Sequence, residues 1–184
     1  MTSFTDSAHH TLTCHPQTPS EAIQGIDVVV GGAAGGNLTL AFALEGDLSA
    51  LRIPEPRPSR RGQGLWRHTC CEVFVMAGQG PGYREFNFSP SGEWAVYDFR
   101  GYPDSGETGD VPTPGIVVRQ TQDRLELVAK ICQDILPQGR RLLLGLSVVV
   151  EEVDGVLSCW ALRHPPGKPD FHHRDAFALQ LELP

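Results

Sequence analysis

The sequence predicts an all-β protein, a two-layer antiparallel β-sandwich, and three observations support this fold class. Apolar and polar residues alternate with a period of two in several segments, which is the signature of half-buried strands. Glycine and proline are abundant, at 20 and 15 of 184 residues, and they fall between those segments, where turns are expected. About ten strand-like segments can be distinguished, and none has a convincing long helical period.

The chain length favours a single domain. Residues 1–21 are polar and lack a sustained apolar period, so we expect a loosely ordered lead-in or a first short strand there. Residues 22–184 are predicted to form one sandwich domain, because chains of this size commonly fold around a single core.

The first predicted pair of strands covers residues 25–30 and 37–46, joined by the glycine-rich segment 31–36. A strand followed by glycines is also found in dinucleotide-binding folds. Here the G-x-G-x-x-G spacing is not met, and the next segment alternates as a strand does instead of following a helical period. We therefore interpret this segment as a hairpin.

Further strands follow in the remainder of the chain, with a predicted exposed loop at 104–115 and room for one helical turn in QDILPQGR (133–140). The turns AGQGPG and SPSG separate the first three of these strands at hairpin spacing. The predicted strands lie near 69–76, 82–89, 93–99, 116–121, 123–131, 141–150, 156–162 and 177–183.

Alternation divides the predicted hairpin 69–89 into two faces. Val73 and Val75 of one strand and Phe86 and Phe88 of the other are expected in the core. Aromatic rings pack on the C–H faces of sugars, while carboxyl and amide groups bond hydroxyls, so the opposite face suits a carbohydrate. A solvated outer sheet face is the alternative interpretation. That opposite face carries Glu72, Phe74, Tyr83, Glu85 and Asn87, with Trp66 just ahead of it.

A second concentration of functional groups lies in RHPPGKPDFHHRD (163–175). Its prolines restrict the loop, and rigid loops commonly carry binding groups. We expect this loop to contact the ligand at the same site as Trp66, although a purely structural role is the alternative. The histidines and aspartates match no familiar zinc spacing, so no metal site is predicted. The candidate ligand-binding residues of the loop are His164, Lys168, Asp170, His172 and His173.

Charge and cysteine content exclude several classes of function. The net charge of −7 argues against a general nucleic-acid surface, and the short basic cluster at 57–61 is expected in a solvated loop. No segment has the length of an apolar membrane span, and the start lacks the pattern of a secretory signal, so we expect a cytoplasmic protein without a membrane partner. The five scattered cysteines are an odd number without zinc-type spacing, and we expect free thiols.

The sequence contains no recognisable catalytic motif such as G-x-S-x-G, a Walker sequence or H-E-x-x-H, and no catalytic residue is assigned. Glu72 and Glu85 could form the carboxyl pair of a glycosidase, but carboxyl groups on adjacent strands are too common to carry that function alone.

Two segments, LWRHTCCEVFV…YREFNFSPSGEWAVYDF and HPPGKPDFHHRDAFAL, resemble the DOMON superfamily. More narrowly, they resemble bacterial DOMON-like proteins associated with the MurB family of cell-wall enzymes, and the related family-nine carbohydrate-binding modules. The resemblance covers roughly residues 22–183. Its most specific parts are the step from Trp66 to Glu72 and the segment from Glu85 to Gly92.

The resemblance implies a β-sandwich that holds a sugar between two tryptophans. Trp66 matches the first of these by position, Glu72 the acidic residue after it, and Trp160 is the match for the second. Arg67 and His68 stand where the modules often carry an acidic pair. Other DOMON domains bind haem b through Met and His ligands, which would involve Met76 and His164, His172 or His173 here.

The sequence therefore predicts a non-catalytic module that binds a carbohydrate or a similar small polar ligand, without a cofactor. The alternatives are a haem-binding electron-transfer domain and an intracellular enzyme that uses the loop 163–175.

Overall fold

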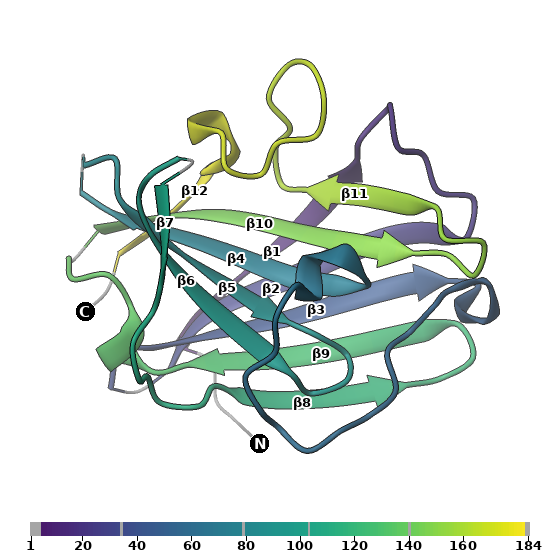
Figure 1. Ribbon diagram of the computed structural model, residues 1–184, viewed down its shortest axis with the longest axis horizontal. Helices are drawn as coiled ribbons and strands as arrows, with labels where there is room; N and C mark the ends of the chain where they lie inside the picture. The colour runs from purple at the N-terminus through teal and green to yellow at the C-terminus, as the bar shows by residue number, and fades with distance from the viewer. Residues whose placement is uncertain (1–4, 34, 79, 103, 140, 183–184) are drawn as a thin grey trace.

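A computed structural model of the chain (Figure 1) describes residues 5–33, 35–78, 80–102, 104–139 and 141–182. Within these ranges the secondary structure consists of strands and four single-turn 3₁₀ helices, and no described helix is long and apolar enough to cross a membrane. The strands are β1 (Thr5–Cys14), β2 (Ile23–Ala33), β3 (Asn37–Gly46), β4 (Cys70–Ala77), β5 (Tyr83–Phe88), β6 (Trp94–Gly101), β7 (Asp104–Glu107), β8 (Gly115–Gln120), β9 (Arg124–Ile131), β10 (Arg141–Glu151), β11 (Leu157–Ala161) and β12 (Leu179–Glu182). The 3₁₀ helices are η1 (Leu48–Ala50), η2 (Leu65–Arg67), η3 (Gln133–Ile135) and η4 (Arg174–Ala176).

The strands form one antiparallel sheet that folds over into the two layers of a sandwich (Figure 1), which confirms the predicted fold class. One layer has the order β1-β2-β3-β9-β8, and the other has the order β7-β6-β5-β4-β10-β11, with β12 also beside β10. The glycine-rich segment joins β2 to β3 as a hairpin. Residues 104–115 were predicted to be one exposed loop, but its first residues form β7, which pairs with β6.

β1 joins the two layers, so of the two alternatives expected for residues 1–21, a loosely ordered lead-in or a first strand, the described part contains the strand. Most of β1 pairs with β2, whereas Thr13 and Cys14 at its end pair with β11 of the other layer. Alternation does not reveal this strand because Leu12 is the only apolar residue within 7–14 that is fully buried. Backbone hydrogen bonding to both layers, rather than a buried side-chain face, specifies β1.

The core lies between the layers, and the register of β4 and β5 confirms its predicted composition. Val73 pairs with Phe86, and both side chains are fully buried, as are Val75 and Phe88. Leucines and valines of β2, β3, β9 and β10 complete the same cluster. Truncating one of these phenylalanines to alanine would cost about 3–5 kcal/mol of stability.

The outer face of β4 is also buried. This is unusual, because the outer face of an antiparallel sheet commonly contacts water. Two segments cover it. Leu65 of η2 packs with Cys70 at one end, and Phe177, after η4, packs with Phe74 and Met76 at the other. Between these covers, the outer face of this layer remains accessible as a cavity.

Candidate ligand-binding site

The floor of the cavity is a polar patch on the outer face of β4, β5 and β10. Glu72 on β4 lies directly across from Asn87 on β5 and from Ser147 on β10. Glu85 is two pairs further along β5, on the same face, and lies across from Phe74. The two glutamates are therefore diagonal neighbours, and both are buried, as are the two polar residues beside Glu72.

Hydrogen bonds hold both carboxyl groups in place. The Asn87 amide Nδ2 donates to Glu85 Oε1 over 2.8 Å, and the Ser147 hydroxyl donates to Glu72 Oε2 over 3.1 Å. The Asn87 Oδ1 atom is buried and has no hydrogen-bond partner among the described residues. Because a buried polar atom without a partner is costly, this floor has hydrogen-bonding capacity left for a ligand.

Burial perturbs the acidity of both glutamates. Burial raises the pKa of Glu85 to about 7, with the Asn87 hydrogen bond opposing the change. The pKa of Glu72 is raised well above its ordinary value, first by burial and then by the negative charge of Glu85. Removal from water disfavours a charged carboxylate, so the protonated form of Glu72 is favoured, and Glu85 is divided between its two forms near pH 7.

Trp66 forms one wall of the cavity. It lies on η2, and its side chain is 41% exposed, whereas the Leu65 side chain beside it anchors the helix to the sheet. The Trp66 ring meets the Tyr97 ring edge-on at a centroid distance of 5.6 Å. An open aromatic face next to buried polar groups is suited to stacking on a ligand.

The loop 163–175 forms a second wall through Phe171 and His172. The His172 backbone amide donates to Asp170 Oδ1, and its ring atom Nδ1 lies 2.8 Å from the Tyr83 hydroxyl. The His172 Nε2 atom is 3.9 Å from Glu85 Oε2. Burial lowers the pKa of His172, opposed by the charge of Asp170, so this imidazole is neutral at pH 7.

The enclosed volume is about 350 Å³, within the range of small-molecule sites. Its lining combines aromatic rings with two acids and an imidazole. The lining residues are Trp66, Glu72, Glu85, Tyr97, Phe99, Val149, Phe171 and His172.

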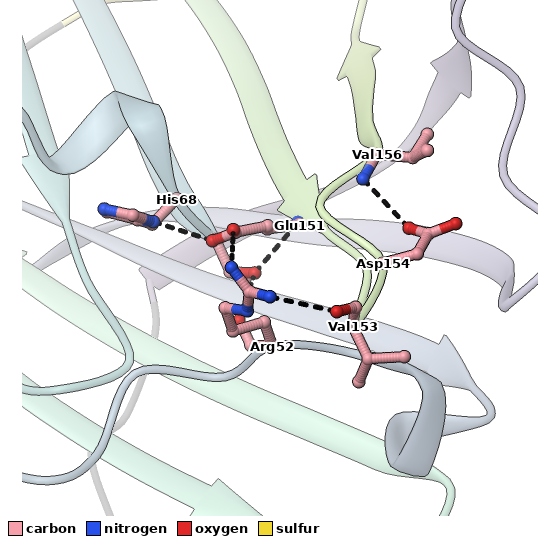
Figure 2. A network of polar contacts seen from close by, with 7 residues as sticks. Arg52, His68, Glu151, Val153, Asp154 and Val156 are labelled. Carbon is pink, nitrogen blue, oxygen red and sulfur yellow. Dashed lines mark hydrogen bonds and ion pairs between the residues drawn. The ribbon is translucent and has the colours of Figure 1, made fainter.

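A polar network secures the segment that carries Trp66 (Figure 2). Glu151, at the end of β10, accepts a hydrogen bond from Arg52 Nη1 over 2.8 Å and lies 2.7 Å from His68 Nδ1. The Thr69 hydroxyl accepts from the Glu151 amide and donates to the Arg52 carbonyl. Both ends of the segment 52–69 are thereby fixed to β10.

The structure brings together several of the predicted ligand-binding residues. Trp66, Glu72, Glu85 and His172 line one cavity, so the loop 163–175 borders the same cleft as the sheet face. Three further predicted residues do not line the cavity but contact lining residues. Asn87 bonds Glu85, Tyr83 contacts His172, and Asp170 holds the His172 backbone.

Trp160 does not lie at the cavity, which corrects the prediction of a second stacking tryptophan. Its side chain is buried in the core between the layers, and its Nε1 donates to the Ser158 hydroxyl. Trp160 pairs with Val148, whose side chain belongs to the same core, so the register of β11 turns this ring inward.

Three predicted loop residues also lie away from the cavity lining. His164 Nε2 contacts the Thr13 carbonyl over 2.7 Å and fixes the loop to β1. His173 Nδ1 accepts from the Asp175 amide and caps η4, while Lys168 is exposed. His164 and His173 thus hold the loop in place, and Phe171 and His172 are its cavity-lining residues.

Four lining residues were not predicted. Tyr97 and Phe99 alternate with Trp94 and Val96 along β6, and Tyr97 pairs with Glu85, so the period of two could have found them. Val149 on β10 likewise alternates with the core residues Val148 and Val150. Phe171 lies in an irregular loop, where no periodic signal exists.

The residues proposed for the alternative functions can also be located. Met76 is buried in a cluster with Phe74, Tyr83 and Phe177 and is not among the cavity-lining residues of the described chain. In the same described ranges, no group of three or more His, Cys, Asp or Glu side chains is arranged to hold a metal ion.

No family model matches the sequence, and no curated protein matches it. Solved structures do match its fold. A putative carbohydrate-binding protein from Bacteroides uniformis superposes with a TM-score of 0.69 at 13% identity, over 96% of this chain and 85% of that one.

Two structures of a family-9 carbohydrate-binding module from Caldicellulosiruptor kristjanssonii are also similar. The complex with cellotriose has a TM-score of 0.60 at 8% identity, covering 87% of this chain and 74% of the other. The complex with glucose has a TM-score of 0.56 at 9% identity, covering 89% and 78%. At such identities the likeness establishes a shared β-sandwich fold.

Proposed function

We propose that this chain is a non-catalytic binding module that holds a carbohydrate in the cavity between Trp66 and the loop 163–175. The observation that carries the proposal is the open Trp66 ring beside a floor of buried, hydrogen-bonded carboxyl groups. A sugar offers both surfaces that such a site requires. Its C–H face packs on an aromatic ring, and its hydroxyls bond in pairs to polar groups.

The volume and the polar groups limit the size of the ligand. A cavity of about 350 Å³ is at the lower end of small-molecule sites, so we expect one or two sugar units. Glu72 and Glu85 would bond adjacent hydroxyls, because their strand positions are diagonal neighbours. Phe171 would be the second stacking ring, because Trp160 is buried in the core.

The comparisons support this proposal at the level of the fold. Structures similar to this one include modules that are in complex with glucose and with cellotriose. We also propose, from the sequence resemblance, that the chain is related to DOMON-like proteins. A cytoplasmic location stays a prediction from the residue pattern.

A fluorescence titration tests the proposal. Of the three tryptophans, Trp66 is exposed whereas Trp94 and Trp160 are buried, so a sugar that stacks on Trp66 should change the emission. Trp66→Phe should remove this change in emission. It should keep the binding, because phenylalanine retains an aromatic face, and the shift in unfolding temperature on adding the sugar measures this binding. Trp160→Phe is the matched control and should keep the change. Absence of any response to mono- and disaccharides at millimolar concentrations would contradict the proposal.

A further inference from the structure

The cavity has a marked charge asymmetry. Two of its lining residues are acids and four carry aromatic rings, but no lysine or arginine of the described chain lines it. The guanidinium of Arg67 lies 6.0 Å from the Trp66 ring centroid, but Arg67 does not line the cavity. This arrangement resembles neither a phosphate site nor a carboxylate site, since both need cationic or clustered N–H donors.

Among the described residues that line the cavity, Glu85 has no lysine or arginine beside it. The His172 Nε2 atom is 3.9 Å from Glu85 Oε2, and burial lowers the pKa of this imidazole. Glu72 and Cys70 on β4 and Tyr83 on β5 interact electrostatically with Glu85, and none of these side chains can carry a positive charge.

A buried carboxylate without a counter-ion is costly, so the empty cavity favours the protonated acid. A ligand that carries an ammonium group would reverse this preference, because it supplies the missing positive charge. The rings of Trp66, Tyr97, Phe99 and Phe171 line the same cavity, and aromatic rings attract a cation. Carboxylate and aromatic faces together form the lining that binds substituted ammonium groups in other proteins.

We infer, on the basis of the proposed carbohydrate-binding function, that the preferred ligand is an amino sugar with a free, positively charged nitrogen. Glu85 pairs with the ammonium group, and Glu72 stays protonated and donates a hydrogen bond to a hydroxyl. Binding then converts the Glu85 acid into a carboxylate and releases its proton to solvent.

Calorimetric titration with four probes tests this inference: glucose, N-acetylglucosamine, glucosamine and N,N,N-trimethylglucosamine. At pH 6, glucosamine should bind at least roughly tenfold more tightly than glucose or N-acetylglucosamine, which corresponds to about 1.4 kcal/mol. The trimethylated sugar has a permanent charge, so any pH dependence of its binding comes from the protein. Its affinity should rise from pH 6 to pH 8, because Glu85 ionises near pH 7.

Proton release gives a second readout that a neutral site would not show. In buffers of different ionisation enthalpy, the heat of binding of the trimethylated sugar at pH 6 should vary with the buffer, and the heat of glucose binding should not. Glu85→Gln should abolish both the preference for glucosamine over glucose and the proton release, because an amide neither carries a negative charge nor loses a proton. Glu21→Gln makes the same substitution at an exposed position outside the cavity lining and should leave both intact.

The outcomes separate this inference from the function on which it rests. Equal affinities for glucose and glucosamine without proton release would overturn the inference and leave the carbohydrate site standing. Failure of all four sugars to bind would overturn the proposed function together with the inference. Retention of the ammonium preference in Glu85→Gln would show that Glu85 is not the partner.

Discussion

His68 Nδ1 lies 2.7 Å from Glu151 Oε2, and this contact joins the segment that carries Trp66 to the end of β10. Glu151 is buried and also accepts from Arg52, so one carboxyl group fixes both ends of the segment 52–69 (Figure 2). The position of the Trp66 ring is therefore determined by a residue that does not line its cavity.

Glu151→Gln is expected to loosen this segment. The substitution removes the negative charge, and only one terminal atom of the amide can accept, so the contacts to Arg52 and His68 are weakened. The stability cost should be about 1–2 kcal/mol, while amide hydrogen exchange of residues 66–68 accelerates and sugar affinity falls. Asp154→Asn is the control, because Asp154 caps the β10–β11 turn by accepting from the Val156 amide. Unchanged exchange at 66–68 in Glu151→Gln would contradict this role.

Trp66→Ala and Trp160→Ala should have opposite effects. Trp66 is 41% exposed, so its truncation should cost less than about 1 kcal/mol of stability, and ligand affinity should fall roughly tenfold or more, as for other aromatic hot spots. Trp160 is buried in the core, and its truncation should cost about 3–5 kcal/mol. Urea unfolding together with calorimetric titration measures both quantities. A large loss of stability in Trp66→Ala would refute its assignment as a binding platform.

Stability should depend on pH through Glu85. Its pKa is about 7 in the folded protein against an ordinary value of 4.5, so between these values the folded protein holds more protons than the unfolded chain. The free energy of unfolding therefore falls as the pH rises from about 4.5 to 7, by an amount of the order of 1–3 kcal/mol. Urea unfolding at pH 5, 6 and 7 should reveal a steeper fall for the wild type than for Glu85→Gln. Parallel profiles for the two proteins would be inconsistent with this shift.

The thiols should divide into two reactivity classes. All five cysteines are free, as the sequence predicted, but Cys70 and Cys71 are fully buried, and burial raises the pKa of both thiols. A thiol reagent should find five groups after unfolding and at most three rapidly reacting groups in the native protein, because the thiolate is the reactive form. Cys14, Cys132 and Cys159 are the partly buried ones. A disulfide in a non-reduced digest would contradict the prediction.

Alternation along single strands was sufficient to predict the sandwich and the floor of the candidate site. In a strand, successive side chains point to opposite faces, so a buried Val73 implies a Glu72 on the other side. Because the hairpin turns are short, the same reasoning extends to Phe86 and Glu85 on the neighbouring strand. The sequence by itself thus determined which residues share the polar face of β4 and β5.

Other features depend on contacts between distant segments, which have no local signal. In β11 both Trp160 and Cys159 could face the core, and the pairing with β10 decides that Trp160 does. In the loop 163–175 only packing against β4 and β5 selects Phe171 and His172 over Lys168 and His173. The tertiary structure alone decided that Trp66 and the pair Phe171 and His172 become two walls of one cavity, because packing between segments far apart in the chain has no local signal in the sequence.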